Sequence, residues 1–308
     1  MAKKKKSKNK ALPPTFIGID LAWSDRNPTG VAVIRDERLV AYSGTLVTDG
    51  EILRFVQEHL DAKNPAVVAI DAPLRVPNES GSRPCDRALS KAWRRFEAGA
   101  LPANRRLLGR GGRGIALDAK QDEVILPKVE KRRKKAKKEQ AEEEVGEIAV
   151  RGERLVAALV QRMRFTEAAV IPKRTQDRLV CEVFPHTTLV SLFDLDKTLK
   201  YKARRGRDYP SRWAELARYQ SLLRSLRQGD PALKRTKDLL VRTQVEGLRG
   251  KAFKEYEDIL DAVTCAYTAS YLWQHGPRHA VTYGSLKKGS ILVPLTSRMA
   301  KRLEEVRG

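Results

Sequence analysis

Apolar residues fall in short β-branched or aromatic runs over the first 75 residues and in longer helical repeats farther along the chain. The first run, TFIGIDLAW at Thr15–Trp23, is typical of a buried strand. Gly18 within it predicts that another element approaches the backbone closely. Two further apolar runs flank the polar turn Asp36–Arg38, and they predict a meander of antiparallel strands with the first.

A helix from about Glu51 to Leu60 precedes a second apolar strand at Ala66–Ile70, which shows no alternation and is therefore expected to be buried on both faces. The order strand, strand, strand, helix, strand predicts an α/β fold with a mixed sheet. Further strands are predicted at Leu179–Phe184, near His279–Thr282 and at Ile291–Val293. Further helices are predicted at Asp86–Glu97, Glu153–Phe165, Trp213–Arg227, Pro231 to about Val245, and Tyr256–Trp273.

Acidic residues stand at the ends of two of these apolar strands. Asp20 lies within the first, and Asp71 directly follows the strand Ala66–Ile70. A carboxylate there is costly to desolvate unless a cation or hydrogen-bond donors meet it, although capping of the following turn would equally explain Asp20 alone. If the two strands are neighbours, the carboxylates converge and repel each other. Mg²⁺ or Mn²⁺ would relieve that repulsion.

A late helix carries a second acidic pair. Asp258 and Asp261 are three residues apart in YEDILDAVTCAYTASYLW, which puts both on one helical face, and the turns after them are nearly all small or apolar. Compensation of the helix dipole is the alternative explanation, and it accounts for one acid more readily than for two. Glu182 is a further acid embedded in a predicted strand.

The charge balance indicates a polyanionic partner. The formal net charge is +23; residues 1–10 carry six Lys and no acid, residues 128–147 carry eight Lys or Arg against six Glu, and the remaining chain keeps +15. Nucleic acid, DNA or RNA, is the first candidate.

Two basic stretches are candidates for contact with that partner. Lys197–Arg212 is dense in Lys and Arg with interleaved Tyr, as a surface that follows a phosphate backbone would be. The glycine-rich stretch Leu107–Gly114 lacks a phosphate-loop ending and is interpreted as a flexible basic loop. The candidate nucleic-acid-binding residues are Lys202, Arg204, Arg205, Arg207, Arg110 and Arg113.

The three cysteines are widely spaced and odd in number, which predicts neither a disulfide framework nor a zinc site and suits a cytoplasmic location. No apolar run reaches the roughly 18 residues of a membrane span, and no secretory signal follows the basic start, so no membrane association is expected.

Taken together, the motifs resemble a known family. GIDLAW, AIDAPL, RPCD at Arg83–Asp86, CEVFPH, YK at Tyr201–Lys202 and DILDA follow one another as in the domain of unknown function 429, described as predicted RNase H-like nucleases. The arrangement of acids is similar to that of Holliday-junction resolvases of the RuvC type.

The resemblance implies a five-stranded mixed sheet with helices on both sides, in an RNase H-like domain at 15–295 with a charged insertion at about 105–150. Residues 1–14 would be a disordered basic arm and 296–308 a tail. Asp20, Asp71, Asp258 and Asp261 would form the metal-binding catalytic cluster, with Glu182 as a further ligand or as a partner of one.

These features predict a nuclease that uses a two-metal carboxylate mechanism. A non-catalytic nucleic-acid-binding protein on the same fold is the first alternative. An actin- or sugar-kinase-like phosphotransferase is the second, although SDRNPTG after the first strand is a poor phosphate loop.

Overall fold

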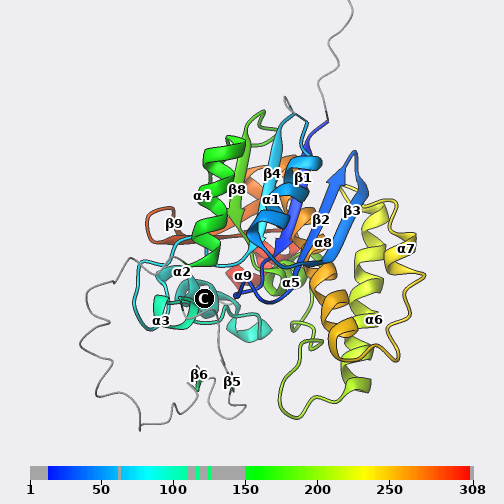
Figure 1. Ribbon diagram of the computed structural model, residues 1–308. Helices are drawn as coiled ribbons and strands as arrows, with labels where there is room; N and C mark the ends of the chain where they lie inside the picture. Colours follow the sequence, from blue (N-terminus) through cyan, green and yellow to red (C-terminus); the bar gives the residue numbers. More distant parts are fainter. Residues whose placement is uncertain (1–12, 62–63, 110–115, 118–123, 126–149, 306–308) are drawn as a thin grey trace, which may run out of the picture.

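The computed structural model describes residues 13–61, 64–109, 116–117, 124–125 and 150–305. Its central sheet has six strands in the order β3-β2-β1-β4-β8-β7 (Figure 1). The strands are β1 Thr15–Asp20, β2 Thr29–Arg35, β3 Arg38–Leu46, β4 Ala66–Asp71, β7 Thr166–Glu167 and β8 Arg178–Glu182. The first three are antiparallel, and β1, β4, β8 and β7 are parallel. The predicted α/β class and mixed sheet are confirmed. The expected number of five strands is one too few, because the sixth strand, β7, has only two residues and leaves no sequence pattern.

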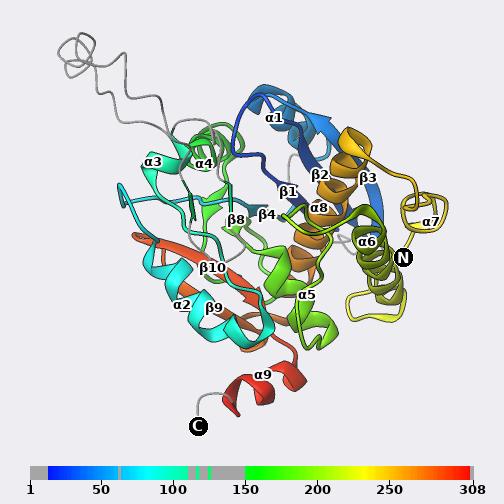
Figure 2. The ribbon, with the colours of Figure 1, turned by 90° about the horizontal axis from the view of Figure 1, so that it is seen from below.

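Helices cover both faces of the sheet (Figure 2). Along β1, Phe16 packs into a core shared with helix α8, Gly250–His275, whereas Ile17 packs into a core shared with α1, Asp49–Glu58, and α4, Arg151–Met163. This alternation follows from the two-residue period of a strand. The predicted close approach at Gly18 is confirmed, because a Cβ there would lie 1.9 Å from the carbonyl oxygen of Ala262 in α8.

The remaining elements surround this centre. A separate antiparallel hairpin, β9 Ala280–Ser285 with β10 Gly289–Pro294, confirms the predicted terminal strand pair. The other helices are α2 Pro84–Trp93, α3 Arg105–Leu108, α5 Pro185–Phe193, α6 Tyr209–Ser225, α7 Lys237–Leu240 and α9 Ser297–Glu304, and the short strands β5 Ala116–Leu117 and β6 Val124–Ile125 pair with each other. None of the helices in the described ranges combines the length and apolarity that a membrane span requires.

The helix predicted from Pro231 to about Val245 is wrong apart from the four residues of α7. The reason is a tertiary contact. Lys234 accepts a hydrogen bond from the Leu39 amide and donates one from its own amide to Glu37, so its backbone runs as a bridge beside the start of β3. These long-range bonds replace the local ones that a helix would have formed.

Candidate functional site

The carboxylates at the two strand ends are neighbours. Asp20 ends β1, Asp71 ends β4, and the two are register partners in the parallel β1–β4 pair. Adjacent strands lie about 4.8 Å apart, so the side chains leave the sheet side by side. The predicted convergence of Asp20 and Asp71 is thereby explained by strand register.

Helix α8 brings a third carboxylate to this point. Gly30 in β2, the register partner of Asp20, lies so close to α8 that a Cβ there would be 2.1 Å from the carbonyl oxygen of Asp258. Gly18 and Asp20 are two apart on one strand face, so the face that admits α8 is also the face of Asp20. The carboxyl groups of Asp20 and Asp258 are close enough for each to shift the pKa of the other.

These three aspartates line a pocket of about 690 Å³ beneath the carboxyl ends of β1 and β4, here called the carboxylate pocket. Its wall comes from the start of α8 and from the segment 198–207, which precedes α6. The charged and aromatic lining residues besides the aspartates are Trp23, Glu97, Phe184, His186, Lys200, Lys202, Arg204, Arg207 and Lys254. The pocket thus has an acidic floor, formed by Asp20, Asp71 and Asp258, and a wall that is mostly cationic.

The three carboxyl groups of the floor are too close together and too buried for all of them to ionise easily. Burial raises the pKa of Asp20 and of Asp71, with repulsion from Asp261 adding to it at Asp20 and repulsion from Asp20 adding to it at Asp71. Burial together with Asp20 raises the pKa of Asp258 to about 9. One oxygen of Asp20, Oδ2, is buried and has no hydrogen-bond partner among the residues that the structure describes. A buried, unpaired carboxylate oxygen beside two further carboxyl groups has the chemistry of a site for a cation.

Asp261 differs from these three, because its partners come from the protein itself. Its carboxylate accepts hydrogen bonds from the hydroxyls of Tyr201 at 2.6 Å and Tyr219 at 3.0 Å, and Lys202 Nζ lies 2.8 Å from Oδ2. Burial opposes ionisation, but Lys202, His186 and the Tyr201 hydroxyl together outweigh it, and the pKa of Asp261 is lowered. Asp261 is fully buried and does not line the carboxylate pocket, so in this arrangement it holds Lys202 in position.

Lys254 pairs with Asp258 one helical turn away. Where the chain is described, no group of three or more His, Cys, Asp or Glu side chains is already arranged to hold a metal ion. The donor chemistry of Asp20, Asp71 and Asp258 fits a hard divalent cation, but the Lys254 ammonium group now occupies one oxygen of Asp258. Binding of a cation by all three would therefore require Lys254 to leave Asp258.

Glu182 ends β8 at the same edge of the sheet but belongs to a separate buried ion cluster. Its carboxylate accepts from Arg83 at 2.5 and 2.9 Å and from the Leu74 amide at 2.9 Å. Arg83 also pairs with Asp86 at 2.7 Å. The RPCD motif thus supplies the partner of Glu182, which fixes α2 to the sheet and leaves Glu182 outside the lining of the carboxylate pocket.

Of the predicted nucleic-acid-binding residues, Lys202, Arg204 and Arg207 line the carboxylate pocket, and Arg205 is exposed next to them. Arg207 donates to the Lys202 carbonyl at 3.1 Å, which braces this basic segment. Arg110 and Arg113 lie outside the described residues.

Sequence reasoning missed Lys254 and Tyr219. The first has a signal, since it lies four residues before Asp258 on one helix. Tyr219 reaches Asp261 from another helix, and nothing local indicates that contact. His186 also faces the pocket, where burial and the nearby Lys202 lower its pKa to about 4, so it is neutral at pH 7.

The family model described as "Protein of unknown function (DUF429)" matches residues 18–282. No curated protein and no solved structure matches the chain. Because the matched region is most of the chain and contains every residue of the carboxylate pocket, the chain belongs to this family.

Proposed function

We propose that this protein is a nuclease that hydrolyses phosphodiester bonds of nucleic acid with the help of Mg²⁺ or Mn²⁺. One observation carries the proposal: Asp20, Asp71 and Asp258 line one pocket whose wall is formed by Lys202, Arg204 and Arg207. An acidic floor suits divalent cations, and a cationic wall suits the phosphates of a polyanion. Together the two features suit an enzyme that cleaves a phosphodiester with the help of metal ions.

The three aspartates would hold the metal. When bound, two divalent cations would supply an activated water and neutralise charge on the leaving oxygen. The buried, unpartnered Oδ2 of Asp20 and the raised pKa values of Asp20 and Asp71 support this assignment, because a cation would stabilise their ionised forms.

The protein's own cations would orient the substrate. Lys202 is held by Asp261 at 2.8 Å and faces the pocket, so its ammonium group is available to a phosphate oxygen at a fixed position. Arg204 and Arg207 extend this wall. These contacts carry no base information, and binding through them would weaken as salt concentration rises.

Cleavage assays test the proposal. The wild type, Asp20→Asn and the exposed-residue control Asp25→Asn are compared on single-stranded and duplex DNA and RNA, each with Mg²⁺, Mn²⁺ or chelator. We expect metal-dependent cleavage by the wild type and the control and none by Asp20→Asn, with nucleic-acid binding retained by all three. Equal cleavage by Asp20→Asn would refute the assignment, and binding without cleavage in every protein would favour the non-catalytic alternative.

A cytoplasmic location is part of the proposal. It is supported by Cys85, Cys181 and Cys265, all of which are free and buried.

A further inference from the structure

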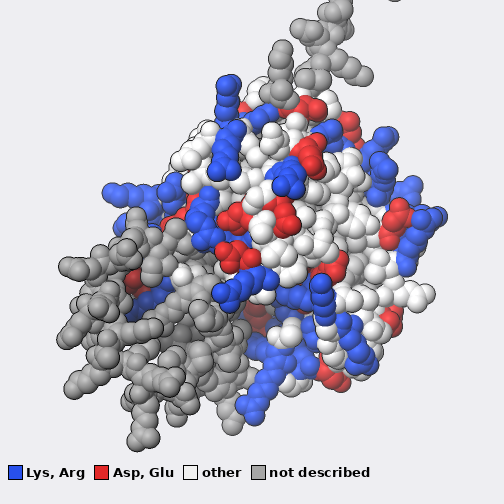
Figure 3. Space-filling view, in the orientation of Figure 1, with Lys and Arg blue, Asp and Glu red and all other residues white. Residues whose placement is uncertain are grey.

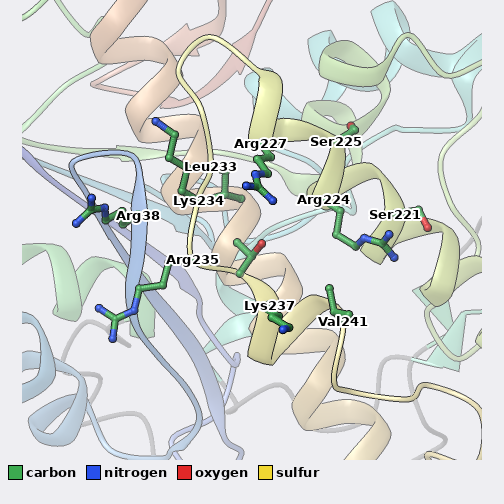
Figure 4. A pocket seen from close by; sticks show the side chains of 11 residues that line it. Arg38, Ser221, Arg224, Ser225, Arg227, Leu233, Lys234, Arg235, Lys237 and Val241 are labelled. Atoms are coloured by element: carbon green, nitrogen blue, oxygen red, sulfur yellow. The ribbon is translucent and has the colours of Figure 1, made fainter.

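A second concave surface lies between the C-terminal half of α6 and residues 233–241, beside the β2–β3 turn (Figure 4). Its volume is about 1000 Å³. We call it the basic pocket, because six of its lining residues are cations, namely Arg38, Arg224, Arg227, Lys234, Arg235 and Lys237. The space-filling view shows Lys and Arg gathered along the edge of the molecule where α6 and α7 lie (Figure 3).

Little acidic charge balances this pocket. Lys234 pairs with Glu37 at 2.6 Å. The other five cations have no carboxylate within salt-bridge distance among the residues that the structure describes. All six are exposed and none of the lining residues is acidic. Like charges gathered around one hollow repel each other, so the pocket favours an anion.

The basic pocket is distinct from the carboxylate pocket. Asp20 and Thr15 lie at opposite ends of β1. Thr15 is paired with Arg35 of β2, and Arg35 is paired with Arg38 of β3. Arg38 therefore lies at the Thr15 end of the sheet. Five residue steps of about 3.3 Å separate the two ends of β1, so the strand positions of Asp20 and Arg38 are about 17 Å apart along the strand direction, and the two pockets share no lining residue.

The donor set suits phosphate groups. Arg224 near the end of α6 and Arg227 in the 3-10 turn Leu226–Gln228 directly after it both line the pocket, and Ser221, Ser225 and Thr236 add hydroxyls around it. Guanidinium groups bind phosphate oxygens in a bidentate manner, and Ser and Thr hydroxyls are regular phosphate donors.

The lining also argues against recognition of bases. It contains no aromatic residue on which a base could stack, and its apolar part is limited to Leu233 and the half-exposed Val241. Contacts to sugar and phosphate, and not to base edges, are what such a surface can make.

We propose that the basic pocket is a second binding site for the phosphate groups of a nucleic-acid strand, separate from the carboxylate pocket. The choice of nucleic acid as ligand rests on the proposed function, although the site itself does not require catalysis. The cations of the two pockets, at opposite ends of the sheet, would contact one long nucleic-acid strand at two places.

The test uses fluorescence anisotropy of a labelled 40-nucleotide DNA strand in chelator, at several salt concentrations. The variant Arg224→Gln/Arg227→Gln/Lys237→Gln is compared with a charge-matched control, Arg162→Gln/Arg278→Gln/Lys288→Gln, whose residues are exposed and line neither pocket. We expect the pocket variant to bind at least tenfold more weakly at low salt, with a log–log salt slope smaller by about 2. Equal affinities of pocket variant and control, or no binding by the wild type, would overturn the proposal.

Two further measurements separate the possible outcomes. Hydrolysis of bis(p-nitrophenyl) phosphate, which is too small to reach both pockets, should be unaffected in the pocket variant. Suppose that none of the proteins hydrolyses this compound or any nucleic acid, while DNA binding is still weakened in the pocket variant alone. The nuclease proposal then fails and the second binding site stands. If the variant loses binding to polyglutamate but not to DNA, the pocket is a site for acidic peptides and the proposal is wrong.

Discussion

Asp20 and Asp71 are direct register partners at the carboxyl ends of two adjacent parallel strands. This pairing places two carboxylates side by side, and the close approach of α8 at Gly18 and Gly30 adds Asp258. Lys202 and Lys254 offset part of the cost of burying three acids together. The proposed cation site would offset the rest of this cost.

Asp261→Asn should destabilise the fold, in contrast to changes at the pocket floor. Loss of the charge leaves Lys202 without its 2.8 Å partner and weakens two buried tyrosine hydrogen bonds. We expect a loss of about 3 kcal/mol in the free energy of unfolding, measured with urea. Asp20→Asn, measured in chelator, should leave stability unchanged or raise it, because it removes repulsion. The opposite order of the two variants would contradict the roles assigned here.

The raised pKa of Asp258 predicts a pH dependence of stability. The folded protein binds this proton more tightly than the unfolded chain between pH 3.8 and about 9. The neutral carboxyl therefore contributes stability below pH 4 that is lost as pH rises to about 9. In chelator, Asp258→Asn should flatten the fall in unfolding free energy between pH 6 and 9 by up to about 1.4 kcal/mol per pH unit. Parallel curves for wild type and variant would show that Asp258 does not titrate in this range.

Removing Lys254 should strengthen metal binding. Lys254 competes with a cation for Asp258, but its side chain is 61% exposed and the pair is accordingly weak. We expect Lys254→Gln to lower the apparent Kd for Mg²⁺ by no more than about fivefold in calorimetric titration. Lys251→Gln, an exposed change one turn earlier on α8, should leave the Kd unchanged. Weaker binding by Lys254→Gln would mean that the lysine assists the site.

The close approach of α8 depends on Gly18. A Cβ at this position would lie 1.9 Å from one α8 backbone atom and 2.2 Å from another, and backbone cannot move aside as a side chain can. Gly18→Ala should lower the unfolding free energy by at least about 3 kcal/mol. Gly50→Ala, in the first turn of α1 with no atom closer than 3.9 Å, should be neutral or stabilising by up to about 1 kcal/mol. Similar effects of the two changes would contradict the packing described.

The sequence predicted the strand-end acids because a carboxylate at the end of an apolar run is unusual whatever its tertiary neighbours. It also predicted that Asp258 and Asp261 lie on one face of α8, because residues three apart on a helix share a face. It could not separate Asp258 from Asp261, because that depends on Tyr201, Tyr219 and Lys202, which arrive from other elements. The basic pocket was hidden for the same reason. Arg38 and Arg227 are far apart in the chain and meet only through the bridge at Lys234.

The most direct test of the central claim is a thermal melt of the wild type and Asp20→Asn in chelator, Mg²⁺ and Mn²⁺. At a metal concentration of about 100 Kd, binding to the folded state adds about 2.7 kcal/mol, which corresponds to a rise in Tm of about 4 °C for a chain of this length. The account predicts this rise for the wild type and for the exposed control Asp25→Asn, and none for Asp20→Asn. An equal response of all three proteins, or a wild type that does not respond to either metal, would contradict a cation site at Asp20, Asp71 and Asp258.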